Sequence, residues 1–158
     1  MKKHIIYFLL TLFVCCNVDA QWTRKYSKDD FTDKETVSYS VPALKGTDNG
    51  MFLLLFCRQN GVGVNWQVSY SDKAKAPYGS MPLEVNVRVD SNEIYKEEWS
   101  WSAAAPMIVP DVDKQKKLLN SLIGSKKLAL KTTFPDAMST FDMTGFDQAF
   151  KEMSAKCK

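Results

Sequence analysis

The sequence contains almost no histidine. The single histidine among its 158 residues is His4, which lies in the N-terminal segment that we interpret as a signal peptide. The exported chain would therefore contain no imidazole. It then has no Ser-His-Asp or Cys-His nucleophile pair and no histidine ligand for zinc. It also lacks the side chain that most often serves as a general base near neutral pH.

A hydrophobic run long enough to span a membrane is also missing. The N-terminal apolar segment Ile5–Val14 has about ten residues, interrupted by Thr11, whereas a spanning helix needs ~20. Lys2 and Lys3 precede this segment, and small residues ending at Ala20 follow it. This is the pattern of a secretory signal peptide. We predict cleavage after Ala20 and a periplasmic or secreted product without a transmembrane segment.

Two cysteines near the end of the apolar segment raise a second interpretation. Cys15 and Cys16 stand where a bacterial lipoprotein carries its acylated cysteine, but bulky Phe13 and Val14 occupy positions where small residues are expected. We therefore favour the cleaved signal peptide over the lipoprotein. The predicted organisation is a signal peptide at 1–20 and a single β-rich exported domain at 21–158.

The chain has no strong excess of charge of either sign. Its formal net charge is +3, and loss of the signal peptide removes two lysines and one aspartate, which leaves +2. Proteins that bind nucleic acid usually have a strongly basic face, so we expect no nucleic-acid partner. The 138 residues after the signal peptide suffice for one domain with its own core.

Alternation of apolar and polar residues dominates the pattern and indicates β-strands. Strands are predicted, in chain order, at 35–41, 51–57, 62–71, 83–90, 93–102, 127–134 and 138–143. Asn60-Gly61 separates two of these runs and predicts a hairpin, because both residues tolerate positive φ. Ser91-Asn92 predicts a second hairpin. The charged residues 22–34 predict an irregular lead-in that could contain a short edge strand.

Two segments have helical spacing instead. Residues 111–123 carry leucines at that spacing and end at Gly124, where a helix stop is expected. Residues 144–157 place apolar side chains at i, i+3, i+4 and i+7, and Thr144 with Asp147 fits a capping box. The predicted fold is mainly β with two helices: an antiparallel, β-sandwich-like sheet with a C-terminal helix packed on it.

The exported chain has two cysteines. Cys57 ends an apolar strand, and Cys157 lies on the apolar face of the last helix. Oxidising compartments favour disulfides. A catalytic thiolate needs a neighbouring base or helix N-terminus, and a redox pair is usually close in sequence. We therefore predict a structural Cys57–Cys157 disulfide, which pins the last helix to the sheet.

Several of these features together resemble a known family. They are Trp22 and DKETVSYS after the signal peptide, Cys57-Arg58, VNVRVD, Trp99-Ser100-Trp101-Ser102, KLALKTTF and FDMTGFDQAFKEMSAKC. The chain resembles the VasI/TagO-type proteins, accessory proteins associated with bacterial type VI secretion, over nearly all of its exported part. The resemblance implies a periplasmic, largely β domain with paired cysteines and no known catalytic residues. The lead-in and the loop 72–82 depart from it.

Two groups of residues are candidates for a binding surface. Trp99 and Trp101 lie two apart, so both face one side of a strand, where they could stack on a sugar ring, anchor a partner peptide or belong to the core. We favour the core. Arg24, Lys25 and Lys28 form a small basic cluster, which could contact an anionic envelope polymer or lipid head groups; we favour an ordinary solvated face.

The acidic residues do not predict a catalytic or metal site. Asp29, Asp30 and Asp33 lack the spacing of a calcium loop, so we interpret them as solvated. Glu97 and Glu98 are adjacent on a strand and point to opposite faces, unlike a glycosidase pair. We expect no cofactor and no metal.

The leading functional hypothesis is a non-enzymatic periplasmic accessory protein. It would contact an envelope or secretion-apparatus protein, in association with type VI secretion. The alternative is a prophage- or pathogen-encoded exported binder, such as an inhibitor or superinfection-exclusion factor. An envelope hydrolase that uses carboxylates alone is the least favoured hypothesis, because the imidazole and the paired acids are missing.

Overall fold

Antiparallel strands make up most of the described chain. The computed structural model describes residues 22–28, 35–46, 51–58, 61–68, 79–102, 106–133 and 136–157. The strands within these ranges are β1 Thr23–Lys28, β2 Glu35–Pro42, β3 Lys45–Gly46, β4 Phe52–Arg58, β5 Gly61–Gln67, β6 Ser80–Val89, β7 Tyr95–Ser102, β8 Met107–Pro110, β9 Lys127–Thr133 and β10 Asp136–Asp142. The helices are α1 Val112–Leu122 and α2 Phe146–Lys156. A mainly β fold with two helices is therefore confirmed.

Some predictions fall outside the described residues. They are the signal peptide at 1–20 with Cys15 and Cys16, the aspartates Asp29, Asp30 and Asp33, Asn60 of the predicted turn, the last residues (69–71) of the strand predicted at 62–71, and most of the loop 72–82. Within the described ranges, neither helix is long and apolar enough to cross a membrane.

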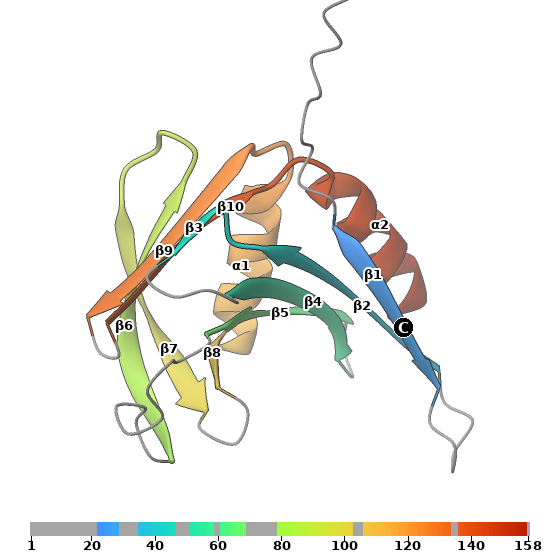
Figure 1. The fold of residues 1–158 in the computed structure, drawn as a ribbon, viewed down its shortest axis with the longest axis horizontal. Coiled ribbons are helices and arrows are strands. Elements are labelled where there is room, and N and C mark those ends of the chain that lie inside the picture. The colour runs from blue at the N-terminus through green and yellow to red at the C-terminus, as the bar shows by residue number, and fades with distance from the viewer. Residues whose placement is uncertain are drawn as a thin grey trace, which may run out of the picture.

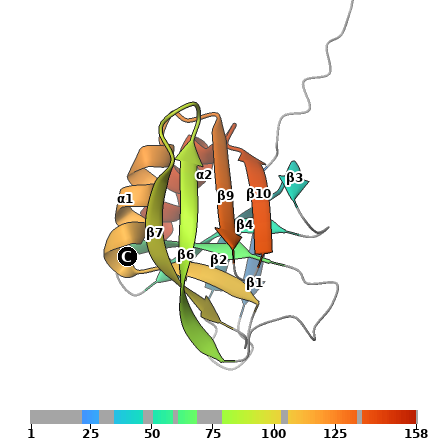
Figure 2. The same cartoon turned by 90° about the vertical axis from the view of Figure 1, so that its left-hand side faces the viewer.

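The strands belong to one sheet, in the order β1-β2-β4-β5-β8-β7-β6-β9-β10-β3. The sheet curls into a half-barrel with two wings. One wing holds β1, β2, β4 and β5 (Figure 1), and the other holds β7, β6, β9 and β10 side by side (Figure 2). The short strand β8 joins the wings, because it pairs with both β5 and β7. The predicted β-sandwich is not confirmed, since the strands form one continuous sheet.

A corner after β2 brings the two ends of the sheet together. The Ala43 N–H donates to the carbonyl of Met51 at 2.9 Å, whereas the next N–H, of Leu44, donates to the carbonyl of Thr140 in β10 at 2.7 Å. β3 then pairs with β10, with Lys45 opposite Thr140. Two consecutive residues thus bond to segments far apart in the strand order, namely Met51, just before β4, and Thr140 of β10. This arrangement requires the sheet to curl.

Both predicted hairpins are present. β4 pairs with β5 up to Arg58 opposite Gly61, whose φ of +124° lies in the region that favours glycine. β6 pairs with β7, and Asp90 follows β6 with φ at 52°. The Asp90 carboxylate accepts the N–H groups of Lys126 and Lys127 at 2.9 and 2.8 Å. These bonds fix the end of this hairpin to the start of β9.

Large side chains from both wings meet in the core. The bulkiest fully buried ones are Trp66, Trp99, Trp101, Phe141 and Phe146. The Trp66 indole N–H in β5 donates to the hydroxyl of Ser139 in β10 at 3.0 Å, and that hydroxyl donates to the sulfur of Met51 at 2.7 Å. Trp66 therefore spans the core between the wings without leaving a buried donor unpaired.

Helix α1 fills the place where the two wings diverge. β5 and β8 pair only at two positions, so part of the β5 edge has no strand beside it. Gln115 of α1, which is 2% exposed, accepts the N–H of Val64 at 3.1 Å and donates to the carbonyl of Pro110 at 2.6 Å. The Gln115 side chain thus supplies a hydrogen-bond acceptor to one N–H of β5 and links that strand to the end of β8. The leucines predicted to face the core, Leu118, Leu119 and Leu122, are buried.

Helix α2 begins differently from the prediction. Its N-cap residue is Gly145 with φ at +85°, and no side chain caps it. The Asp147 carboxylate instead accepts the N–H of Gly124 at 3.0 Å, and the Thr144 N–H donates to the Asp142 carboxylate at 2.9 Å. The predicted capping box is therefore wrong, because a tertiary contact with Gly124 engages the Asp147 carboxylate and no side chain caps the helix. Residues of α2 contact β2, β4 and β5.

Candidate functional site

The two tryptophans considered for a binding surface lie in the core. Trp99 and Trp101 are each 1% exposed. They alternate along β7 with exposed residues, so the face that carries them points inward. Their assignment to a possible binding surface is wrong, and the core interpretation is confirmed.

A buried carboxylate accompanies these tryptophans. Glu97, which is 9% exposed, accepts the Trp99 indole N–H at 3.1 Å and lies 3.2 Å from the Lys117 ammonium of α1. That ammonium also lies 4.8 Å from the centroid of the Tyr95 ring. Burial, followed by the Glu97 charge, raises the pKa of Tyr95, and a hydrogen bond with Ser121 opposes this shift. Because both Glu97 oxygens are engaged, the cluster ties α1 to β7.

The neighbouring carboxylate diverges from Glu97, as predicted. Glu98 is exposed on the opposite face of β7. A shallow hollow between β6 and β7 lies next to both residues, and Glu84 and Lys96 pair at 2.9 Å beside it. This ion pair is more than half exposed, so it contributes little to stability. The two glutamates do not converge on a common point where a substrate could bind.

A second polar cluster joins α2 to β2. The Tyr39 hydroxyl donates to the Glu152 carboxylate, which also accepts the Gln148 side-chain amide at 3.1 Å. These hydrogen bonds, with that from Tyr39 the larger effect, hold the pKa of Glu152 below its usual value, and the charges of Arg24 and Lys156 add to this. Burial and the bond to Glu152 raise the pKa of Tyr39. This cluster too lies between elements of the fold.

The predicted basic cluster lies on β1, and its members point to both faces. Residues alternate along a strand, so Arg24 and Lys28 share one face while Lys25 lies on the other. Lys28 stands opposite Glu35 across the pair with β2. The positive charge of Arg24 contributes to the lowered pKa of Glu152.

On its own face, Lys25 stands opposite Ser38, between Thr36 and Ser40, so β2 presents hydroxyl groups and no carboxylate to it. The structure therefore places Arg24, Lys25 and Lys28 on one strand but not in one compact patch.

β1 is the edge strand of the sheet, which sequence reasoning left uncertain. Within the described part of the chain it pairs with β2 on one side only and lies at the end of the sheet (Figure 1). All six of its residues are exposed. Trp22 precedes it and packs against Phe146 of α2, with ring centroids 5.7 Å apart. β1 is thus held by an aromatic contact at Trp22, the residue before its start, and along its length by β2. The sequence of β1 shows little alternation of apolar and polar residues, because neither face of the strand is buried. The pattern therefore did not predict it firmly.

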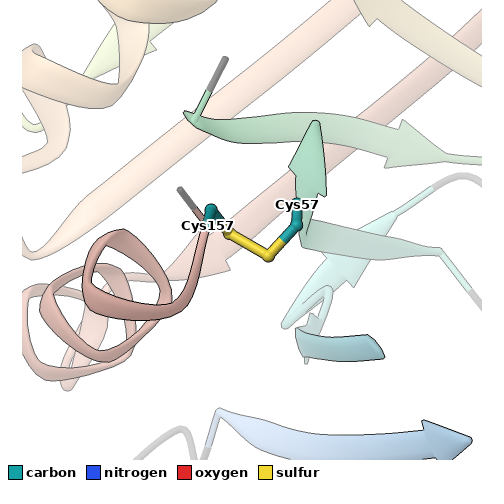
Figure 3. The surroundings of a disulfide bond; sticks show 2 residues. All are labelled: Cys57 and Cys157. Atoms are coloured by element: carbon teal, nitrogen blue, oxygen red, sulfur yellow. A yellow bond between two sulfur atoms is a disulfide. The ribbon is translucent and has the colours of Figure 1, made fainter. Parts of the chain in front are cut away.

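The predicted disulfide is present (Figure 3). Cys57 in β4 and Cys157 after α2 are bonded at 2.06 Å, with 5.1 Å between their Cα atoms and a sequence separation of 100. Cys157 is 8% exposed, and its N–H donates to the carbonyl of Met153 at 2.8 Å. The bond joins the end of α2 to the wing that contains β1.

The described ranges contain no group of three or more His, Cys, Asp or Glu side chains arranged to hold a metal ion. No family model, curated protein or solved structure matches this chain.

Proposed function

We propose that this chain is a non-enzymatic accessory protein of the bacterial cell envelope, exported and associated with type VI secretion, which acts by binding another protein. The main support from the structure is the open edge of β1. Its six residues expose one row of main-chain groups and three cationic side chains. An exposed strand edge can pair with a strand from another chain.

The rigidity of β1 favours binding. β2 is bonded along the whole of β1, from Thr23 opposite Ser40 to Lys28 opposite Glu35. Trp22 anchors the start of the strand to α2. A partner that docks on this edge does not have to order it, so less conformational entropy is lost on association.

The polar clusters of the described chain support a binding role rather than a catalytic one. Glu97 is engaged by Trp99 and Lys117, and Glu152 is engaged by Tyr39 and Gln148. Each cluster links a helix to the sheet. A general acid or base needs a carboxylate oxygen that can exchange a proton with the substrate. The oxygens of Glu97 and Glu152 are instead hydrogen-bonded to other side chains of the fold.

Photo-crosslinking in the bacterium that encodes the chain tests the proposal. A photoreactive amino acid at Lys25, on β1, should give a covalent adduct with one envelope protein. The matched control carries the same photoreactive amino acid in place of Lys131, which is exposed in β9 of the other wing, and should give no adduct. Equal adducts from both positions, or none from Lys25, contradict the proposal.

Mass spectrometry of the adduct identifies the class of partner. A secretion-apparatus component supports the proposed association, whereas a phage-encoded protein assigns the chain to the alternative class of exported binders. A parallel incubation with peptidoglycan tests the claim that the chain is not an enzyme, since any catalytic release of fragments contradicts it.

A further inference from the structure

The chemistry of the β1 edge indicates what kind of partner it accepts. β1 is six residues long and therefore spans ~20 Å, at about 3.3 Å per residue. That length suits one extended segment of similar length. Its sequence, TRKYSK, has three cations and no acidic residue.

Two of these cations, Arg24 and Lys25, indicate which charge an added strand should carry. Lys25 faces only hydroxyl groups on β2, and Arg24 lies on the other face with Glu152 as a nearby opposite charge. Because Arg24 and Lys25 are consecutive, the residues opposite them on an added strand would also be consecutive. Tyr26 follows, with its side chain hydrogen-bonded to Glu35 and the residue still 52% exposed, and aromatic side chains pair well with apolar ones across strands.

A second copy of this chain is a poor partner for the same edge. Pairing two β1 strands would place six cations on two adjacent strands, and like charges across strands are destabilising. Basic side chains on an edge commonly prevent such self-pairing. The charges that disfavour a second copy favour a strand of opposite charge.

We propose that β1 accepts an extended segment of the partner protein as an additional strand, and that this segment carries two consecutive acidic residues beside an apolar one. The acidic residues lie opposite Arg24 and Lys25, and the apolar residue lies opposite Tyr26. Main-chain hydrogen bonds hold the segment, and the charges select it. This inference rests on the proposed function, because it specifies the partner at the same strand.

A designed peptide tests the inference directly. The probe is acetyl-Thr-Val-Glu-Glu-Val-Thr-amide, with a Lys-Lys peptide of otherwise identical sequence as its control. Titration to about 1 mM, which detects even weak affinity, is followed by amide chemical shifts of the isotope-labelled domain. The acidic peptide should shift amides of β1 and the adjoining residues of β2, less so at high salt. The Lys-Lys peptide should not shift them.

Charge reversal provides a quantitative test. Lys25→Glu should weaken binding of the acidic peptide about tenfold, because an attractive cross-strand pair becomes repulsive. Lys131→Glu is the matched control and should leave the affinity unchanged. No shifts with the acidic peptide, shifts outside β1 and β2, or equal weakening by both variants overturns the inference. Dimerisation through β1 in sedimentation experiments overturns it as well.

Proline substitution tests for main-chain pairing. Lys25→Pro and Tyr26→Pro each remove one N–H, and in a strand one of two consecutive N–H groups points away from β2. The variant that keeps the wild-type urea midpoint should lose peptide binding. Retained binding in that variant overturns strand addition. If Lys25 crosslinks to a partner in the cell but the peptide does not bind, only this inference fails; without a crosslink, the proposed function fails.

Discussion

Replacing both cysteines with alanine, in the variant Cys57→Ala/Cys157→Ala, removes the covalent link between β4 and the end of α2. The bridge closes a separation of 100 residues. The chain-entropy model gives a bridge of this span about 4.7 kcal/mol of stabilisation, through the restricted unfolded chain. With a urea dependence of about 2 kcal/mol per molar, the midpoint of unfolding should fall by about 2 M. The native fold should persist, because the apolar residues of α2 remain buried.

Urea titrations followed by tryptophan fluorescence measure this effect on three samples. They are the oxidised wild type, the reduced wild type and the double variant. The reduced wild type and the double variant should have the same urea midpoint, and it should be well below that of the oxidised wild type. The reasoning is refuted if the double variant and the oxidised wild type share one midpoint. Free thiols at Cys57 and Cys157 in the protein isolated without reductant, measured by alkylation and mass spectrometry, would also refute it.

Three further changes test particular contacts by urea unfolding. Gln115→Leu should lose about 1–3 kcal/mol, because the buried N–H of Val64 loses its acceptor; an unchanged midpoint contradicts the bridging role. Tyr39→Phe should destabilise the protein at pH 7, where the lowered pKa of Glu152 favours the fold, and the deficit should shrink as acid protonates that carboxylate. A deficit that stays constant down to about pH 3 contradicts this, since that pH lies below the ordinary glutamate pKa. Gly63→Val should cost about 1–3 kcal/mol, since an added Cβ would lie 2.7 Å from a neighbouring ring; wild-type stability would contradict the close packing.

Local patterns predicted most of the individual elements. The alternation at 35–41 and 83–90 and the turn residues at Gly61 are local signals, and each led to the right strand or hairpin. The disulfide was predictable because the predicted signal-peptide cleavage would leave only two cysteines to pair. The burial of Trp99 and Trp101 followed from the general tendency of large aromatic residues to be buried.

Long-range pairing was not predictable from these signals. The curl depends on Leu44 bonding to β10, about a hundred residues away in sequence, and no periodicity encodes that contact. Asp147 has the sequence context of a capping residue, yet it binds the Gly124 N–H, because tertiary contacts override local preferences. Gln115 did carry a signal, since it is a polar residue on the apolar face of a predicted helix.

β1 escaped a firm prediction because neither of its faces is buried, and a strand exposed on both faces has no alternation to detect. Its edge position follows from the pairing order of the whole sheet.

Amide hydrogen exchange of Thr23–Lys28, measured in the free protein and in the complex recovered by crosslinking, tests strand addition at β1 most directly. In the free protein, the N–H groups bonded to β2 should exchange slowly and the alternate ones rapidly. In the complex, the alternate amides should also become slow, because a partner strand then accepts their hydrogen bonds. Unchanged exchange along β1, or new protection confined to another part of the sheet, would contradict the account.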